Sequence, residues 1–263
     1  MSLKIDSPGP GRPTDPDLPP EGRPERRADK FFGNNWLFFL AALVLVLVNL
    51  GLVLTSNQGE ALVAINRLRS PGWDLFFKVG THFAEPVAYL AILVLVSAFS
   101  FRKAIYLVVA GTLAGVVAGI CKAIFAQARP MRWFYDNQNE IWHSLARFED
   151  KWQSWDEVSS FPSGHTASAF ALYGFLAFNA RRWKTGVTLF CLSIAIMVSF
   201  SRMYLLYHFL RDVTAGAFIG LLVAMLTYYL QGKVLTGFPG LDRGWYERIV
   251  GLPPVAERVP PPK

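Results

Sequence analysis

The chain has 263 residues, of which 52% are hydrophobic and 17% charged, and its formal net charge is +7. Soluble domains carry about a quarter charged residues, so this composition, clustered in long apolar runs, indicates a membrane protein. The positive charge does not indicate nucleic acid binding. Lysines and arginines lie largely at the ends of apolar runs, where they anchor helices and set topology.

Residues 1–30 are rich in proline, glycine and charge, which predicts a disordered tail. The apolar run 36–55 is long enough to span a bilayer as an uncleaved anchor. Five further spans are expected at 85–101, 104–125, 165–180, 185–202 and 212–231. The amphipathic segment 60–84 is expected to lie along the outer interface. The predicted fold is all-α: a polytopic membrane protein with six transmembrane helices in a domain of residues 31–231, followed by a C-terminal tail, 232–263.

The short loops predict the orientation of these spans. Arg102-Lys103 and Arg181-Arg182-x-Lys184 are compact basic connectors on one side of the membrane, the side that also holds both termini. Cytoplasmic loops carry an excess of lysine and arginine, so this side is expected to be cytoplasmic. The opposite, outer face of a bacterial-type inner membrane then carries the 126–164 connection and the 203–211 turn.

Glycines recur at every fourth position in two of the expected spans, namely Gly111, Gly115 and Gly119 in the third and Gly216 and Gly220 in the sixth. Small residues at this spacing let helix backbones approach closely in lipid. The pattern predicts that the third and sixth spans pack tightly against neighbouring helices along the faces, here called glycine stripes, that carry these residues.

Three short motifs carry most of the polar residues near the apolar runs. They are Lys122-x6-Arg129-Pro130, Pro162-Ser163-Gly164-His165 and Ser201-Arg202-x5-His208-x3-Asp212. The motif residues at the ends of the expected third to sixth spans all fall at one membrane face. Charges at the edge of hydrocarbon are costly, and such a set without a structural need indicates a functional site.

Each of these residues has a structural interpretation when taken alone, because Ser163 and Asp212 each occupy a helix N-cap position and a lysine can snorkel to the interface. Together they supply what phosphate chemistry needs. Ser163 and Gly164 begin the fourth span, where free N–H groups and the helix dipole favour an anion. The cations Lys122, Arg129 and Arg202 can neutralise phosphoryl oxygens.

His208 and Asp212 are four residues apart, which places them on one face if the turn is helical. A carboxylate there can accept from one ring nitrogen, fix the tautomer and leave the other nitrogen to attack phosphorus. The residues therefore indicate a membrane-embedded phosphatase that acts on lipid phosphates.

The three motifs resemble, without a mismatch, those of the type 2 phosphatidic acid phosphatase superfamily in its membrane lipid-phosphatase branch, and the resemblance covers about residues 36–231. It implies a transfer in two steps, in which His208 forms a phosphohistidine, Asp212 holds His208, and His165 protonates the leaving oxygen. The residues that would bind the phosphoryl oxygens are Lys122, Arg129, Ser163, Gly164 and Arg202. No metal and no other cofactor is expected.

The expected substrates are phosphomonoester or pyrophosphate lipids in the bilayer, namely undecaprenyl pyrophosphate, phosphatidylglycerol phosphate and phosphatidic acid. A lipid A phosphatase and a lipid-to-lipid phosphotransferase with the same site are alternatives. A third reading is a non-catalytic lipid carrier, against which the intact motif set argues.

Overall fold

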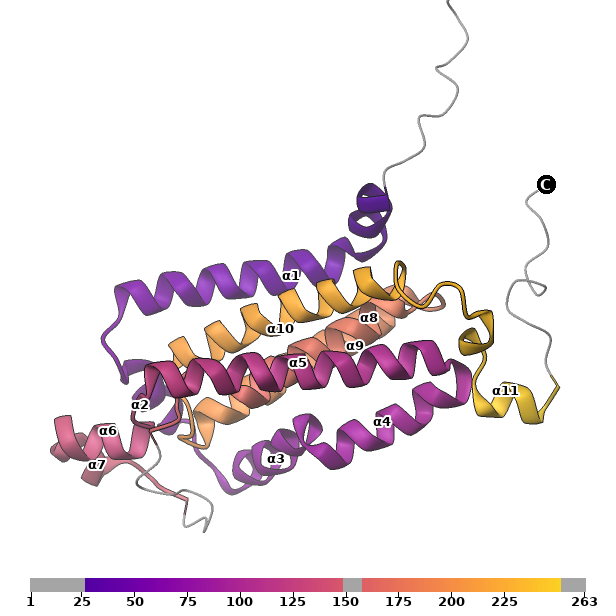
Figure 1. The fold of residues 1–263 in the computed structure, drawn as a ribbon. Helices are drawn as coiled ribbons and strands as arrows, with labels where there is room; N and C mark the ends of the chain where they lie inside the picture. The colour runs from indigo at the N-terminus through magenta and orange to yellow at the C-terminus, as the bar shows by residue number, and fades with distance from the viewer. Residues whose placement is uncertain (1–26, 149–157, 252–263) are drawn as a thin grey trace, which may run out of the picture.

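The computed structural model describes residues 27–148 and 158–251, with side chains from Gly33 onward. Long helices lie side by side along one axis, with short helices at both ends (Figure 1). The described elements are α1 (Arg27–Thr55), α2 (Glu60–Asn66), α3 (Pro71–Thr81), η1 (His82–Ala84), α4 (Pro86–Phe99), α5 (Phe101–Phe125), α6 (Pro130–Asn137), α7 (Asn139–Ser144), α8 (Gly164–Asn179), α9 (Lys184–Tyr204), α10 (Leu210–Gln231), η2 (Pro239–Asp242) and α11 (Trp245–Ile249). The all-α prediction is confirmed.

Several helices begin where the sequence supplies a cap. The hydroxyl of Ser70 accepts from the backbone N–H of Trp73 at 3.4 Å at the start of α3, with Pro71 in the first helical position. Ser100 caps α5 by accepting from the N–H of Lys103 at 3.3 Å. These side chains satisfy backbone donors that have no partner inside the helix.

The helix α8 lies at the centre of the bundle. It packs against α10, α9 and α5, and residues around its whole circumference are buried, including Ala169, Phe170 and Leu172 at 0% exposure. A helix that is apolar on all sides is one that its neighbours surround. Its first turn is therefore held in place from several directions, which matters for the site described below.

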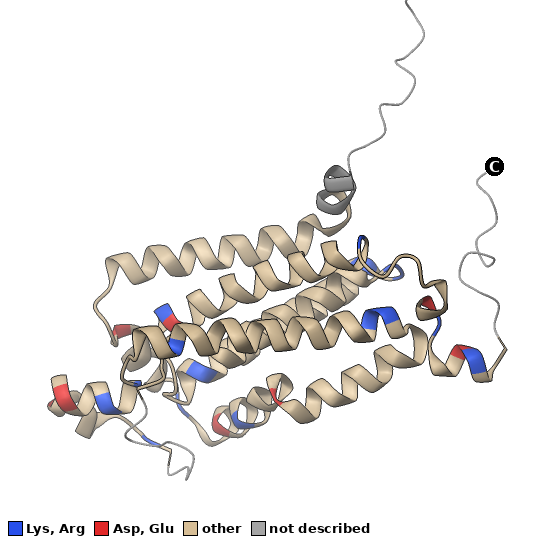
Figure 2. Cartoon of the chain, in the orientation of Figure 1, with Lys and Arg blue, Asp and Glu red and all other residues tan. Residues whose placement is uncertain are grey.

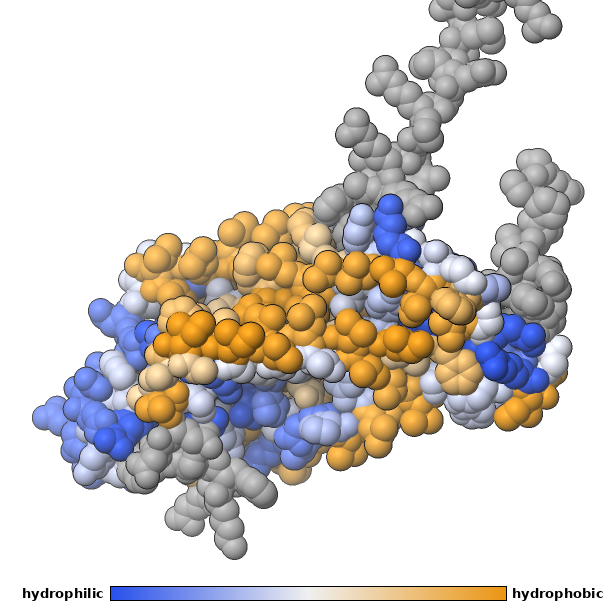
Figure 3. Space-filling view, viewed as in Figure 1, coloured by the Kyte–Doolittle hydropathy of each residue, from blue (hydrophilic) through white to orange (hydrophobic). Residues whose placement is uncertain are grey.

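The outer surface has the character expected of a chain in lipid. Exposed large hydrophobic side chains run along α1, for example Leu40, Val44 and Leu47. Figure 3 shows hydrophobic residues covering the lengths of α1 and α5, with hydrophilic residues gathered toward the ends. Lysine, arginine, aspartate and glutamate likewise gather toward the two ends of the bundle (Figure 2). Apolar surface of this extent requires an apolar surrounding.

Six spans are not confirmed. Among the described residues, four stretches are long and apolar enough to cross a membrane: Gly33–Thr55, Phe101–Asn137, Lys184–Tyr204 and Leu210–Gln231. A fifth results if Pro71–Ala84 and Pro86–Phe99 are one span bent by 54°. The helices α4 and α8, with 14 and 16 residues, are each shorter than the roughly 17–25 residues that a single helix needs to span a bilayer. The segment predicted to lie along the interface thus includes α3, which forms part of this bent pair.

The glycine stripes of α5 and α10 differ in how closely a neighbouring helix backbone approaches them. A Cβ at Gly216 would lie 2.6 Å from the carbonyl oxygen of Ser163, and one at Gly220 would lie 2.4 Å from that of Ala167. The prediction of close backbone packing is confirmed for α10, and the partner is α8. It is wrong for Gly115 and Gly119, where an added Cβ meets nothing within 4 Å.

The tails were predicted at 1–30 and 232–263. Residues 1–26 and 252–263 lie outside the described residues, whereas α1 already begins at Arg27. Part of the C-terminal segment packs on the bundle. The buried Arg102 contacts Asp242 (Nε to Oδ1, 2.5 Å) and donates to the carbonyl oxygens of Leu235 and Phe238 at 2.5 and 3.0 Å. This basic connector residue is therefore bound inside the protein.

Candidate active site

The buried pair of His208 and Asp212 occupies the turn between α9 and α10. The Nδ1 of His208 lies 3.6 Å from Oδ2 of Asp212, and the two side chains are 2% and 0% exposed. The same carboxylate oxygen accepts from the N–H of Phe209 at 2.9 Å and from the hydroxyl of Ser160 at 2.5 Å. Asp212 is thus not the N-cap residue that the sequence suggested: it lies at the third position of α10, accepts from the N–H of the N-cap residue Phe209, and has the same oxygen beside the imidazole.

Burial also sets the charge of this imidazole. The pKa of His208 is lowered from its ordinary 6.5 to about 4, chiefly by the loss of water and also by the nearby cations Arg202 and Arg129, while Asp212 opposes these effects. The ring is therefore neutral at physiological pH. A neutral imidazole has a lone pair available for attack on an electrophile.

The second motif forms the turn that begins α8. The hydroxyl of Ser163 accepts from the N–H and the hydroxyl of Thr166 at 3.4 and 3.0 Å. The N–H of Ser163 donates to the carbonyl oxygen of Asp212 at 2.9 Å, which ties the second motif to the third. An added Cβ at Gly164 would meet nothing within 4 Å, so open space lies beside this helix N-terminus. That space suits an anion.

Arg202 lies in the last turn of α9 and is 6% exposed. Its Nη1 donates to the hydroxyl of Thr81 at 2.8 Å, and its guanidinium carbon lies 4.0 Å from the centre of the Tyr207 ring. Among the described residues, its Nε has no hydrogen-bond partner. A buried charge with an unused donor is suited to a ligand oxygen.

Lys122 closes α5, and Arg129 directly precedes α6, with its Nη2 3.3 Å from the hydroxyl of Ser159. The charges of Lys122, Arg129 and Arg202 all act electrostatically on the ring of His165, and His208 lies near enough to couple to it. The structure thus brings all eight residues predicted from the motifs to one region, where the ends of α5 and α9 and the starts of α8 and α10 meet.

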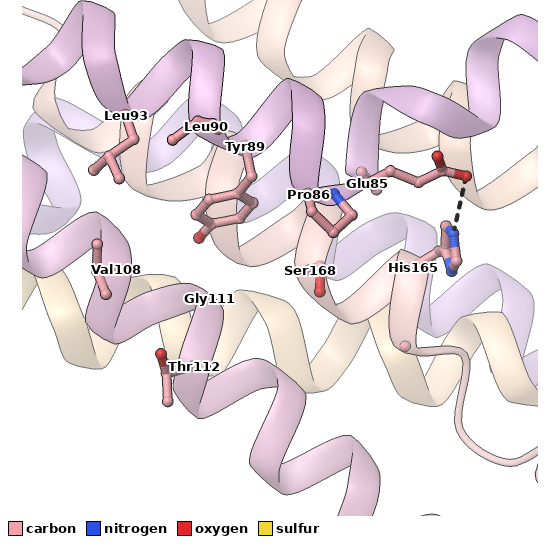
Figure 4. Close-up of a pocket in the computed structure, with 12 residues that line it drawn as sticks. Glu85, Pro86, Tyr89, Leu90, Leu93, Val108, Gly111, Thr112, His165 and Ser168 are labelled. Carbon is pink, nitrogen blue, oxygen red and sulfur yellow. Dashed lines mark ion pairs between the residues drawn. The ribbon is translucent and has the colours of Figure 1, made fainter.

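His165, in the first turn of α8, faces a cavity of about 680 Å³ that runs between α4 and α5. Figure 4 shows His165 and Glu85 at one end of this cavity and Leu90, Leu93 and Val108 along its length. One end of the cavity is therefore polar and adjoins the cationic cluster, while most of the remaining lining is apolar.

Three polar residues of the site were not found by the sequence analysis. Thr81 positions Arg202, Ser160 binds Asp212, and Glu85 lies 3.7 Å from His165 (Oε1 to Nε2). Ser160 lies three residues before Ser163, and this nearness to the second motif is the sequence signal that could have identified it. Nothing in the local pattern marks Thr81 or Glu85, because the bend between α3 and α4 brings them to the site.

The arrangement gathers three cations, a helix N-terminus and two imidazoles, which is a set of groups suited to a tetrahedral oxyanion. Within residues 27–148 and 158–251, no three histidine, cysteine, aspartate or glutamate side chains are grouped so that they could hold a metal ion.

A family model described as the PAP2 superfamily matches residues 103–235 of this chain. Two curated proteins match shorter stretches. The chain is 37% identical over 84 residues to the probable diacylglycerol pyrophosphate phosphatase 1 of Schizosaccharomyces pombe. It is 34% identical over 82 residues to phosphatidylglycerophosphatase B of Bacillus subtilis. Each alignment covers 28% of this chain, and the matched stretch spans 30% and 40% of the two relatives.

Two solved structures share the fold. LpxE of Aquifex aeolicus superposes with a TM-score of 0.54 and 25% identity, over 65% of this chain and 94% of that one. A PAP2-type phosphatidylglycerolphosphate phosphatase of Bacillus subtilis superposes with a TM-score of 0.53 and 23% identity, over 77% and 98% of the two chains. The second likeness concerns the fold alone.

Proposed function

The chain belongs to the PAP2 superfamily of membrane lipid phosphate phosphatases, and on this premise we propose that it removes phosphate from lipid headgroups by way of a phosphohistidine. One observation carries the proposal: the buried His208–Asp212 pair lies within a cationic cluster that adjoins a cavity with apolar walls. The cluster suits a phosphate and the cavity suits a hydrocarbon chain.

In the first step His208 attacks phosphorus through Nε2 while Asp212 holds the Nδ1 side of the ring. The bond from phosphorus to the lipid oxygen breaks, and that oxygen takes a proton from His165. The 3.6 Å separation of the His208–Asp212 pair supports these roles, because closing it by less than an ångström makes a hydrogen bond.

In the second step water attacks the phosphohistidine, and His165 accepts a proton from that water. Inorganic phosphate leaves, and both histidines return to their starting forms. Through both steps the phosphoryl oxygens would be bound by Lys122, Arg129, Ser163, Gly164 and Arg202. The unused Nε donor of Arg202 and the open space beside Gly164 support this assignment.

Among lipids, we place phosphatidylglycerol phosphate, phosphatidic acid and undecaprenyl pyrophosphate before lipid A phosphates. The names of the two curated relatives support glycerophospholipid phosphates, one a pyrophosphate and the other a monoester. Transfer of the phosphate from His208 to a second lipid hydroxyl remains the alternative that uses the same site.

We also propose the orientation and the number of spans. With α8 as a sixth span inside the bundle, both termini lie in the cytoplasm and the site opens to the periplasm. The positions of Lys103, Arg181 and Lys184 support this topology, because they line a cavity of about 560 Å³ with no acidic residue among its described lining. Basic residues of this kind concentrate on the cytoplasmic side.

The test is a phosphate-release assay of the purified protein across a panel of these lipids, with His208→Ala as the control. Inorganic phosphate released in step with substrate lost supports hydrolysis, and a newly phosphorylated acceptor lipid supports transfer. Full turnover by His208→Ala would end the proposed mechanism.

A further inference from the structure

Glu85 lies between two histidines at the bend between η1 and α4. Its Oε2 accepts a hydrogen bond from Nδ1 of His82 at 2.6 Å, and its Oε1 lies 3.7 Å from Nε2 of His165. Figure 4 shows the carboxylate directed at the imidazole of His165. None of the three motifs includes Glu85, and the mechanism above does not use it.

His165 lies among positive charges, so a nearby carboxylate matters for the charge that its ring can carry. To protonate a leaving oxygen, His165 must carry a positive charge. Positive charges act on it from α9, from the end of α5 and from the segment before α6, namely those of Arg202, Lys122 and Arg129. Like charges disfavour a charged imidazole. Among the described residues that line the cavity at His165, Glu85 is the only carboxylate.

We propose, as an extension of the proposed function, that Glu85 is a positioning residue that holds His165 in the protonated form from which it acts as the acid. An opposite charge within ion-pair range favours the charged form of an imidazole. The proton that moves to the leaving lipid oxygen is a ring proton of His165, and it returns from the attacking water in the second step.

The role of His82 follows from the same geometry. Its side chain is 66% exposed, and its ring donates to the carboxylate oxygen that does not face His165. It fixes the rotamer of Glu85 from outside the site. Glu85 also acts electrostatically on Arg202, so the carboxylate balances part of the charge of the cluster.

The experiment compares two soluble substrates of similar size that lack an acyl chain, phenyl phosphate and 4-nitrophenyl phosphate. The nitrophenolate leaves without needing a proton, whereas the phenolate, with a pKa of about 10, gains from one. We expect Glu85→Gln to lower kcat/KM for phenyl phosphate about 10- to 100-fold. For 4-nitrophenyl phosphate the loss should stay within about threefold, because acid catalysis contributes little there. Glu140→Gln, an exposed residue of α7, removes the same charge away from the site and should change neither rate.

The ratio of the two rates does not depend on how much of a preparation is folded, so misfolding cannot imitate the result. An equal loss on both substrates, or no loss on either, would overturn the role given to Glu85. The basic limb of the pH profile for phenyl phosphate should also move to lower pH by about one unit in Glu85→Gln, because the imidazolium loses its counter-charge. A limb that stays in place counts against the proposal, whereas Glu85→Asp should restore part of both effects.

The proposal and the proposed function fail in different ways. If the wild-type protein releases no phosphate from either aryl substrate or from any lipid, the function itself is wrong. If the wild type is active and needs His208, but Glu85→Gln keeps the wild-type ratio, only the role of Glu85 is wrong.

Discussion

The backbone N–H of Ser163 donates to the carbonyl oxygen of Asp212 at 2.9 Å, and this bond joins the start of α8 to the first turn of α10. The side chain of the same aspartate faces His208 at 3.6 Å. A single residue therefore sets the distance between the turn suited to an anion and the imidazole suited to attack. Any change that moves one of these motifs relative to the other should reduce activity.

The nucleophile can be tested by its covalent product. We expect His208→Ala and Asp212→Ala to lower phosphate release by at least about 10³-fold while the protein stays folded in the membrane. Rapid acid-free quenching of the wild type with radiolabelled substrate should trap a label that is stable in alkali and lost in acid, as a phosphohistidine is. A trapped label that survives in His208→Ala would assign the nucleophile to another residue.

Arg202→Lys should lower kcat/KM by about 10- to 100-fold, because an ammonium cannot keep the bond to Thr81 and still offer a fork to phosphate. Steady-state kinetics on phosphatidic acid measure this loss. The matched control is Arg132→Lys in α6, an exposed residue paired with Asp136, which should leave the rate unchanged. Wild-type kinetics in Arg202→Lys would exclude a bidentate role.

Gly216→Ala should lower both stability and activity. Its Cβ would lie 2.6 Å from the carbonyl oxygen of Ser163, so α8 and α10 must separate or the turn must shift, at a cost of about 1–3 kcal/mol. Thermal unfolding in detergent and phosphate release check the two effects. Gly115→Ala is the control, because its Cβ meets nothing within 4 Å. Equal behaviour of the two variants would contradict the packing described for α10.

Ser160→Ala removes the hydroxyl that donates to the carboxylate of Asp212 at 2.5 Å. The carboxylate would then be less firmly oriented, and we expect kcat to fall about 10-fold with little change in KM. Ser144→Ala, in which the lost hydroxyl bonds only within α7, serves as the control. A change confined to KM would indicate that Ser160 contributes to substrate binding.

The titration of His208 should have its midpoint near pH 4 instead of 6.5. The ring binds no proton in the folded protein between these values, whereas the unfolded chain does, so His208 makes folding less favourable as pH falls through this window. Nuclear magnetic resonance of the protein labelled in histidine, with His208→Gln to assign the signal, measures the midpoint. A midpoint at 6 or above would mean that water reaches the ring.

Much of this site could be predicted from local sequence. His208 and Asp212 lie close together because His208 is in the turn before α10 and Asp212 is in the first turn of that helix. Ser163 is an N-cap because its hydroxyl accepts from a residue three positions later. Such relationships need only the chain on either side, and sequence patterns report them well.

The residues brought in by tertiary packing could not be predicted in this way. Glu85 and Thr81 reach the site because α3 and α4 meet at a 54° bend, with Pro86 starting the second helix. Likewise, spacing alone does not say which glycine stripe faces a neighbour, and Gly115 faces none. A hydropathy pattern also does not separate a short buried helix such as α8 from a lipid-facing one.

The cavity beside His165 has consequences for where the products go. It is bounded by Leu90 and Val108, both substantially exposed on the flank of the bundle. In the proposed hydrolysis, the open flank of this cavity would let the dephosphorylated lipid return to the bilayer, while inorganic phosphate would be released to water. The two products would then partition into different phases, which opposes the reverse reaction.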